Sequence, residues 1–280
     1  MRHRQSHVKV SANELHSQLN KALLGLGLTQ AAATDASDMV CWLTLHGFDG
    51  IATLKTSLDL IEHCQTNVSA ETSPLSALRW DTDTRTLSID TQGGSALLFG
   101  NLWFEYSKSL AMQHDEIAVL VENCPDVFLL MGYLPTLQSP GLNIYARAQQ
   151  SATSPITYFK FSSGMKLPDV WQTSIGSEDR EPLTVCLTRP PTRAPEESER
   201  ETVVRNKAGA DTQTNGRTSE MGDTEAEYHQ TAAELNTVYE QKLKTGIDID
   251  PDLWGQLKHY GLATLVEADD ASRMGAGPSD

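Results

Sequence analysis

The chain has 280 residues, of which 39% are hydrophobic, and its 37 acidic residues outweigh 22 basic ones to give a formal net charge of −15. Such a negative field repels phosphate backbones and anionic lipid head groups, so we expect neither a nucleic acid nor a membrane surface as partner. No apolar run approaches the ~20 residues that span a bilayer, and the polar N-terminus lacks the apolar core of a secretory signal. The length allows one large or two modest domains, and we expect the protein in the cytoplasm.

Four cysteines, Cys41, Cys64, Cys124 and Cys186, are spread widely along the chain. They form no C-x-x-C pair and have no partner histidines at the spacing of a metal site. We therefore expect reduced, mostly buried thiols and no metal ion.

Residues 1–70 are predicted to form an N-terminal helical unit. Ser11 and Glu14 stand three apart before an apolar series with helical spacing, which indicates a capping box and an amphipathic helix. Thr29 is a candidate cap for a second helix that runs up to Gly47, and a third helix follows it.

Residues 71–188 are predicted to form a reduced mixed core, either α/β or α+β. The segment from Arg79 to Asp90 alternates in the manner of a hairpin, residues 95–100 (SALLFG) could form a short strand, and residues 101–114 have helical spacing. The other predicted strands are EIAVLVEN, DVFLLMGYL, GLNIYAR, ITYFKFS and PLTVCLT.

The last third of the chain begins with a segment of different composition. Residues 189–227 are rich in Pro, Thr, Glu, Arg and Gly and contain almost no large apolar side chains, so we predict a disordered linker. Residues 228–269 are predicted to return as C-terminal helices that pack on the N-terminal unit, the last one capped by Asp250 with Pro251 at its first position. Residues 270–280 are predicted to be a flexible tail.

One short stretch carries candidate chemistry. His46 follows the apolar face of the second helix, and Asp49 and Gly50 lie close behind it. A histidine at this position can act as an acid or base near neutral pH, but it also interacts favourably with the helix C-terminal dipole. Because no second residue is evident that would assist His46 in catalysis, we prefer the interpretation that His46 stabilises the end of the helix.

The order of helices, turns and strands resembles the malate/L-lactate dehydrogenase family that does not use a Rossmann fold. The segments that carry this resemblance are residues 10–51 (VSANELHSQL…LHGFDGI), residues 116–133 (EIAVLVENCPDVFLLMGY), residues 141–147 (GLNIYAR) and residues 239–257 (YEQKLKTGIDIDPDLWGQL). Residues 265–277 are also similar to uncharacterised bacterial proteins assigned to a domain of unknown function. The resemblance implies a dimer and a nicotinamide-dependent reductase of 2-oxo acids or cyclic imines.

Both histidine motifs of that family are altered in this chain. The first motif, L-R-G-x-x-S-H-G-x-x-R-L, has a Ser-His pair implicated in catalysis; Leu45, Gly47 and Asp49 fit its start, but the Ser-His pair is missing and His46 falls where the family has arginine. In the second motif, N-S-x-H-F-G, Asn123 fits the asparagine, while Asp126 stands at the histidine position.

These departures leave two main hypotheses. The preferred one is a non-catalytic relative without a cofactor, acting as a homodimer or as the partner subunit of an oxidoreductase. The alternative is an NAD(P)H-dependent enzyme with a rebuilt active site that uses His46, Asp49 or Asp126. A scaffold protein with no link to redox chemistry is a third possibility.

Overall fold

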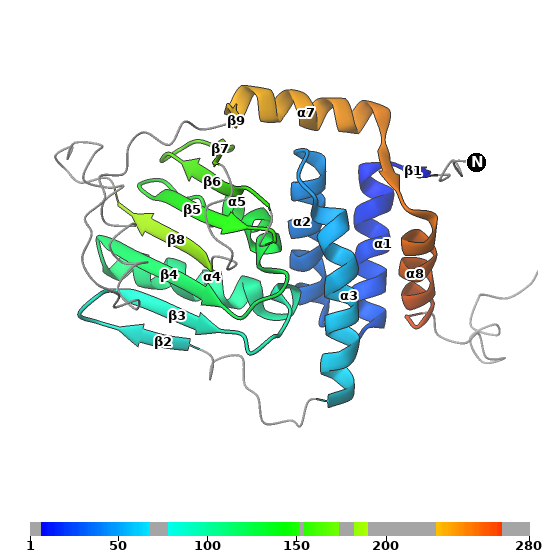
Figure 1. Ribbon diagram of the computed structural model, residues 1–280, viewed down its shortest axis with the longest axis horizontal. Helices are drawn as coiled ribbons and strands as arrows, with labels where there is room; N and C mark the ends of the chain where they lie inside the picture. Colours follow the sequence, from blue (N-terminus) through cyan, green and yellow to red (C-terminus); the bar gives the residue numbers. More distant parts are fainter. Residues whose placement is uncertain (1–6, 68–77, 152–153, 174–181, 190–227, 265–280) are drawn as a thin grey trace, which may run out of the picture.

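The computed structural model describes residues 7–67, 78–151, 154–173, 182–189 and 228–264. Within these ranges the chain is a mixed α/β protein in which a helical unit lies beside one large sheet (Figure 1). The predicted disordered linker, apart from Arg189, and the predicted tail lie outside the described residues. The predicted boundaries between the segments stay predictions.

The N-terminal helical unit follows its local capping signals. Its helices are α1 (Ala12–Gly25), α2 (Gln30–Leu45) and α3 (Gly50–Asn67). The capping box before α1 is confirmed, because the Ser11 hydroxyl accepts a hydrogen bond from the Glu14 N–H while the Glu14 carboxylate accepts one from the Ser11 N–H. The Thr29 hydroxyl caps α2 by accepting from the Ala32 N–H.

The sheet has eight strands in the order β2-β3-β4-β8-β5-β6-β7-β9. The strands are β2 (Leu78–Asp81), β3 (Thr86–Asp90), β4 (Glu116–Glu122), β5 (Asn143–Gln149), β6 (Ile156–Phe161), β7 (Asp169–Thr173), β8 (Leu183–Thr188) and β9 (Tyr228–Gln230). Among the described strand pairs only β3 and β4 are parallel, and the helix α4 (Ala96–Gln113) connects them. Of the strands predicted from the sequence, the hairpin β2–β3 and the strands β4, β5, β6 and β8 are confirmed.

One face of the sheet supplies the core. In-register partners on β3, β4, β8, β5, β6 and β7 form a continuous row of fully buried apolar side chains, namely Leu87, Val119, Val185, Ala146, Phe159 and Val170. These side chains belong to one hydrophobic core that also includes the buried faces of the helices. Burial on one face therefore fixes the register of the strands.

Two predicted strands are wrong. Residues 95–100 begin the helix α4, because the Ser95 hydroxyl accepts from the Leu97 N–H and caps it. The apolar run DVFLLMGYL forms a short 3₁₀-helix, η1 (Val127–Gly132), followed by one turn of α-helix, α5 (Leu134–Leu137). A short, fully buried apolar run lacks the alternation that would separate a strand from a buried helical turn.

The C-terminal elements return to the helical unit. After β9, the helix α7 (Ala232–Thr245) runs from the edge of the sheet across to the helical unit, where β10 (Ile247–Ile249) pairs with β1 (Val8–Val10) (Figure 1). The helix α8 (Pro251–Leu262) then packs against α1. Asp250 caps α8 as predicted, because its carboxylate accepts from the Asp252 and Leu253 N–H groups.

The described part of the chain has no helix with both the length and the apolar character needed to cross a bilayer. Cys41, Cys124 and Cys186 are buried and form no disulfide among the described residues.

Candidate functional site

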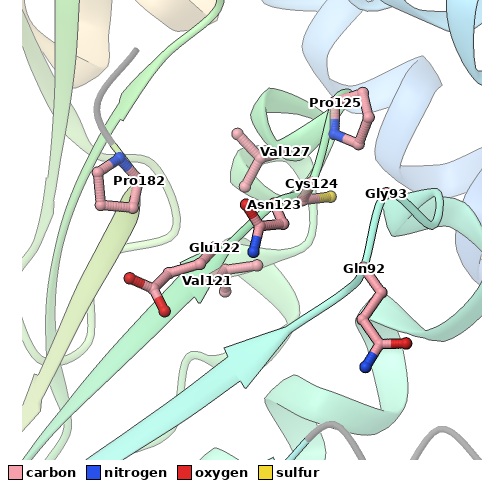
Figure 2. Close-up of a pocket in the computed structure, with 9 residues that line it drawn as sticks. All are labelled: Gln92, Gly93, Val121, Glu122, Asn123, Cys124, Pro125, Val127 and Pro182. Atoms are coloured by element: carbon pink, nitrogen blue, oxygen red, sulfur yellow. The ribbon is translucent and has the colours of Figure 1, made fainter. Parts of the chain in front are cut away.

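The carboxyl ends of the parallel strands β3 and β4 open onto a pocket with a volume of about 720 Å³. In open α/β sheets, ligands bind outside the carboxyl ends of parallel strands, where the strand order changes direction. Figure 2 shows Gln92 and Gly93 on one side of the end of β4 and Pro182, just before β8, on the other. The lining residues are Gln92, Gly93, Val121, Glu122, Asn123, Cys124, Pro125, Val127 and Pro182.

Two tight turns form the rim of this pocket and are hydrogen-bonded to each other. Gln92, Gly93 and Asn123 all have left-handed backbone conformations, with φ of 53°, 86° and 53°. The Asp90 carboxylate accepts from the Asn123 side-chain amide at 2.8 Å and from the Gln92 N–H at 3.0 Å. These bonds, the Asn123 bond foremost, lower the pKa of Asp90, and the Thr91 hydroxyl adds a 2.6 Å bond to the Asn123 carbonyl. These hydrogen bonds therefore hold the two turns in one conformation before any ligand binds.

The described residues that line the pocket carry only negative charge. Glu122 is the only charged residue among these nine, and its side chain is exposed. No lysine, arginine or histidine is among the described residues that line the pocket. The lining therefore disfavours the carboxylate or phosphate groups of an anionic ligand.

Asp126 stands between the lining residues Pro125 and Val127 in the chain and binds the N-terminus of α4. Its carboxylate accepts from the Ala96 N–H at 2.8 Å and from the Ser95 hydroxyl at 2.5 Å, and the side chain is fully buried. The N-terminus of a helix after the first strand of a β-α-β unit is the usual position for an anionic phosphate, because its N–H groups are unpaired and its dipole is positive. In this chain the carboxylate of Asp126 occupies that position.

Cys124 stands two residues before Asp126 and is also buried. Its thiol donates a hydrogen bond to the Asp126 carboxylate at 3.3 Å. Burial and the nearby negative charge of Asp126 raise the pKa of Cys124 well above its usual range. Because the thiolate is the nucleophilic form, Cys124 is suited to packing and not to nucleophilic catalysis.

His46 is enclosed by aromatic rings. It ends α2, where only 5% of its surface is exposed, and its ring lies between those of Trp42 at 4.3 Å and Tyr239 at 5.1 Å between centroids. The Nδ1 atom is 2.7 Å from the Trp42 carbonyl oxygen, so Nδ1 carries a proton and donates it to this bond. Burial lowers the pKa of His46, partly offset by the bond to Trp42, and the ring is neutral at pH 7.

The three candidate catalytic residues have different surroundings. His46 lies between α2 and α7, Asp126 caps α4, and Asp49 is exposed immediately before α3. Within the described residues no group of three His, Cys, Asp or Glu side chains is arranged to hold a metal ion. Sequence reasoning did not identify Ser95 or Tyr239; a serine before a helical run is a local signal, whereas Tyr239 lies far along the chain.

The fold and the site together define a class: a mixed α/β protein with a helical unit that includes α8, and a pocket at the one parallel strand pair among the described strands. Solved structures of malate/lactate dehydrogenase-like proteins have a similar fold. Malate dehydrogenase from Entamoeba histolytica has a TM-score of 0.56 at 12% identity, covering 93% of this chain and 99% of its own. Delta1-piperideine-2-carboxylate reductase from Pseudomonas syringae has a TM-score of 0.52 at 11% identity, covering 90% of this chain and 99% of its own.

A third solved structure and one protein family are also similar to this chain. A putative malate/lactate dehydrogenase from E. coli has a TM-score of 0.57 at 10% identity, covering 93% of this chain and 96% of its own. The family described as a protein of unknown function (DUF3726) matches residues 10–91, which is less than half of the chain. No curated protein gives a significant sequence match. At these identities the likeness to the dehydrogenases is one of fold.

Proposed function

We propose that this chain is a non-catalytic relative of the malate/lactate dehydrogenase-like oxidoreductases, acting in the cytoplasm by self-association or as the partner subunit of an oxidoreductase. The observation that carries this proposal is the surroundings of Asp126, the residue at the histidine position of the family's second motif. Its carboxylate is fully buried and bound to the N-terminus of α4. A side chain in that state holds a helix and has no surface with which to meet a substrate.

His46 supports the same proposal. A general acid must reach the substrate oxygen or nitrogen and must carry a proton to give. The ring of His46 is covered by Trp42 and Tyr239, its Nδ1 proton is engaged by a helix carbonyl, and its lowered pKa keeps it neutral. It therefore lacks both the access and the protonation state that reduction of an oxo acid or imine requires.

The residues at the parallel strand pair do not fit a nicotinamide dinucleotide. Its pyrophosphate would need unpaired N–H groups or cationic side chains. The Ala96 N–H at the start of α4 already binds Asp126, and the one charged group among the described residues that line the pocket is the carboxylate of Glu122. We therefore propose that no such cofactor is held there.

The alternative function is an NAD(P)H-dependent reductase of a 2-oxo acid or cyclic imine with a rebuilt active site. One observation favours it: a volume of about 720 Å³ lies within the range of small-molecule pockets. Asp49 is the one candidate of the three whose side chain is exposed. Asp49 would therefore be the candidate able to reach a substrate as an acid or base in such an enzyme.

A cofactor titration separates the two functions. NADH and NADPH are added to the full chain at up to millimolar concentration while protein fluorescence and the unfolding temperature are followed. We expect neither signal to shift with either nucleotide. A saturable shift that is lost in His46→Ala but kept in His16→Ala, a partly exposed histidine on α1, would overturn the proposal.

A further inference from the structure

The helix α7 connects the sheet to the helical unit, yet little of it is buried. Its ends are fixed by short strand pairings, because β9 pairs with β7 before it and β10 pairs with β1 after it (Figure 1). Between these ends Leu235 is the only buried residue of α7, whereas nine residues of α2 are buried. We call α7, with β9 and β10 at its ends, the strap. A helix with so few buried contacts opens locally at low cost in free energy.

The inner side of the strap meets the helical unit at the ring of His46. The rings of His46 and Tyr239 lie 5.1 Å apart between centroids, with an angle of 20° between their planes. A Cβ atom on Gly47 would lie 3.2 Å from the side chain of Val238, so the end of α2 lies close against the same part of α7. The middle of the strap is therefore held by Leu235 in the core and by the contact with the end of α2.

The two rings that cover His46 differ in their freedom to move away from it. Trp42 lies one turn earlier on the same helix, and its carbonyl oxygen accepts the bond from Nδ1 of His46. Tyr239 belongs to another element and covers the ring only while α7 is in place. A change that makes the covered ring unfavourable can therefore be relieved by movement of α7, but not by movement of Trp42.

The surroundings of His46 do not balance a positive charge. No ion pair formed by the described residues includes His46, and Asp49, three residues later, has an exposed side chain. The other rings packed on this cluster are those of phenylalanines. On α7, Glu240 is exposed, whereas the half-buried Lys242 stands two turns after Leu235 and thus on the inner side of the helix. Its ammonium group adds to the positive charge that a protonated ring would meet.

We propose that α7 is an acid-sensitive strap: protonation of His46 separates its ring from Tyr239 and opens the middle of α7, while β9 and β10 hold the ends. A buried charge without an anionic partner is unfavourable, and the open state returns the ring to water. Attraction between the imidazolium and the two aromatic faces opposes this opening, but it is weaker than the lost hydration of the charge. The pKa of His46, which burial lowers, agrees with this balance. The inference goes beyond the proposed function and holds whether or not the chain is catalytic.

Amide hydrogen exchange of the full chain at pH 7.5 and 5.0, corrected for the intrinsic exchange rate at each pH, tests the opening. The open state binds the proton with the ordinary pKa of histidine and the closed state with a lower one, so opening becomes more favourable as the pH falls through 6.5. We expect the protection of α7 amides to drop at least about fivefold at pH 5.0. Urea below the unfolding transition should change α7 exchange little at either pH, because a local opening exposes little surface.

Four variants separate His46 from other groups that titrate. His46→Phe keeps an aromatic ring beside Trp42 and Tyr239 without a titrating group, so α7 protection should differ by less than about twofold between the two pH values. His16→Gln alters a partly exposed histidine on α1 and should keep the native response. Tyr239→Ala should lower α7 protection already at pH 7.5, whereas Tyr239→Phe, which keeps the ring, should behave as the native chain. Circular dichroism of each variant checks that the fold is retained.

Three results would overturn the inference. Equal α7 protection at both pH values in the native chain would show that the aromatic faces hold the charged ring in place. An undiminished acid response in His46→Phe would assign the proton to another group. Exchange of α7 at pH 5.0 that depends on urea as steeply as the exchange of β4 would indicate unfolding of the whole chain. None of these results bears on cofactor binding, which the NADH and NADPH titration tests separately.

Discussion

At the scale of single residues, Asp126 joins the turn after β4 to the N-terminus of α4 and should be important for stability. Asp126→Ala leaves the buried Ser95 hydroxyl and Ala96 N–H without their acceptor, so we expect the free energy of unfolding to fall by about 3 kcal/mol. Urea denaturation measures this loss. Asp83→Ala, in the exposed turn between β2 and β3, should cost no more than about 0.5 kcal/mol. A loss below about 1 kcal/mol for Asp126→Ala would contradict the capping role.

His46 should make the folded state sensitive to acid. Because burial lowers the pKa of His46 in the folded protein, the unfolded chain binds the proton more readily, and stability falls as the pH drops from 6.5 towards the lower, folded pKa. In His46→Phe this contribution is absent while an aromatic ring still stacks between Trp42 and Tyr239. We expect the native chain to lose more unfolding free energy than the variant between pH 7.5 and 5.5, and equal losses would argue against a buried neutral ring.

The sequence located His46 correctly at the end of a helix but could not predict its surroundings. One of the two rings that cover it belongs to Tyr239, on a helix near the other end of the chain. Likewise, the sequence puts Asp126 at the histidine position of the family's second motif, whereas its hydrogen-bond partners Ser95 and Ala96 lie 31 and 30 residues earlier. The role of each side chain therefore depends on a contact that local pattern cannot supply.

At the scale of elements, the packing of α8 on α1 depends on a glycine at the end of α1. A Cβ atom on Gly25 would lie 1.9 Å from the backbone oxygen of Tyr260, so Gly25→Ala forces the two helices apart. We expect a loss of about 3 kcal/mol in unfolding free energy. The matched control is Gly255→Ala in α8, where a Cβ atom meets nothing within 4 Å and the higher helix propensity of alanine should add about 0.5 to 1 kcal/mol. Differential scanning calorimetry of both variants separates the two effects, and similar shifts would contradict the close contact.

Elements with local signals were predicted well, and elements that depend on distant partners were not. The capping residues Ser11, Thr29 and Asp250 each act within three residues of themselves, and the helices they begin are confirmed. The short strands β1, β9 and β10 have three residues each and exist through pairing with chain far away in sequence, such as Val8 with Ile249. A segment of that length carries no periodicity of its own to detect.

At the scale of the whole molecule, the fold class followed from alternating helical and strand patterns, but the strand order did not. The strand β8 inserts between β4 and β5, so Val119 pairs with Val185 across 66 residues. Such pairings are set by burial of one sheet face against the helices, as the row from Leu87 to Val170 shows. The pocket at the end of β3 and β4 could not be predicted for the same reason, since Pro182 reaches it only through this topology.

The charge of the whole molecule leads to a final prediction. A net charge of −15 makes the compact state repel itself, and salt shortens the range of that repulsion from ~30 Å at 0.01 M to ~8 Å at 0.15 M. We expect the unfolding temperature to rise by a few degrees over this interval, as it does when a domain of this size gains about 1 kcal/mol. Sodium and potassium chloride should give equal shifts at equal ionic strength if screening is the cause. A fall in unfolding temperature with added salt would show instead that attractive ion pairs outweigh the self-repulsion of the acidic chain.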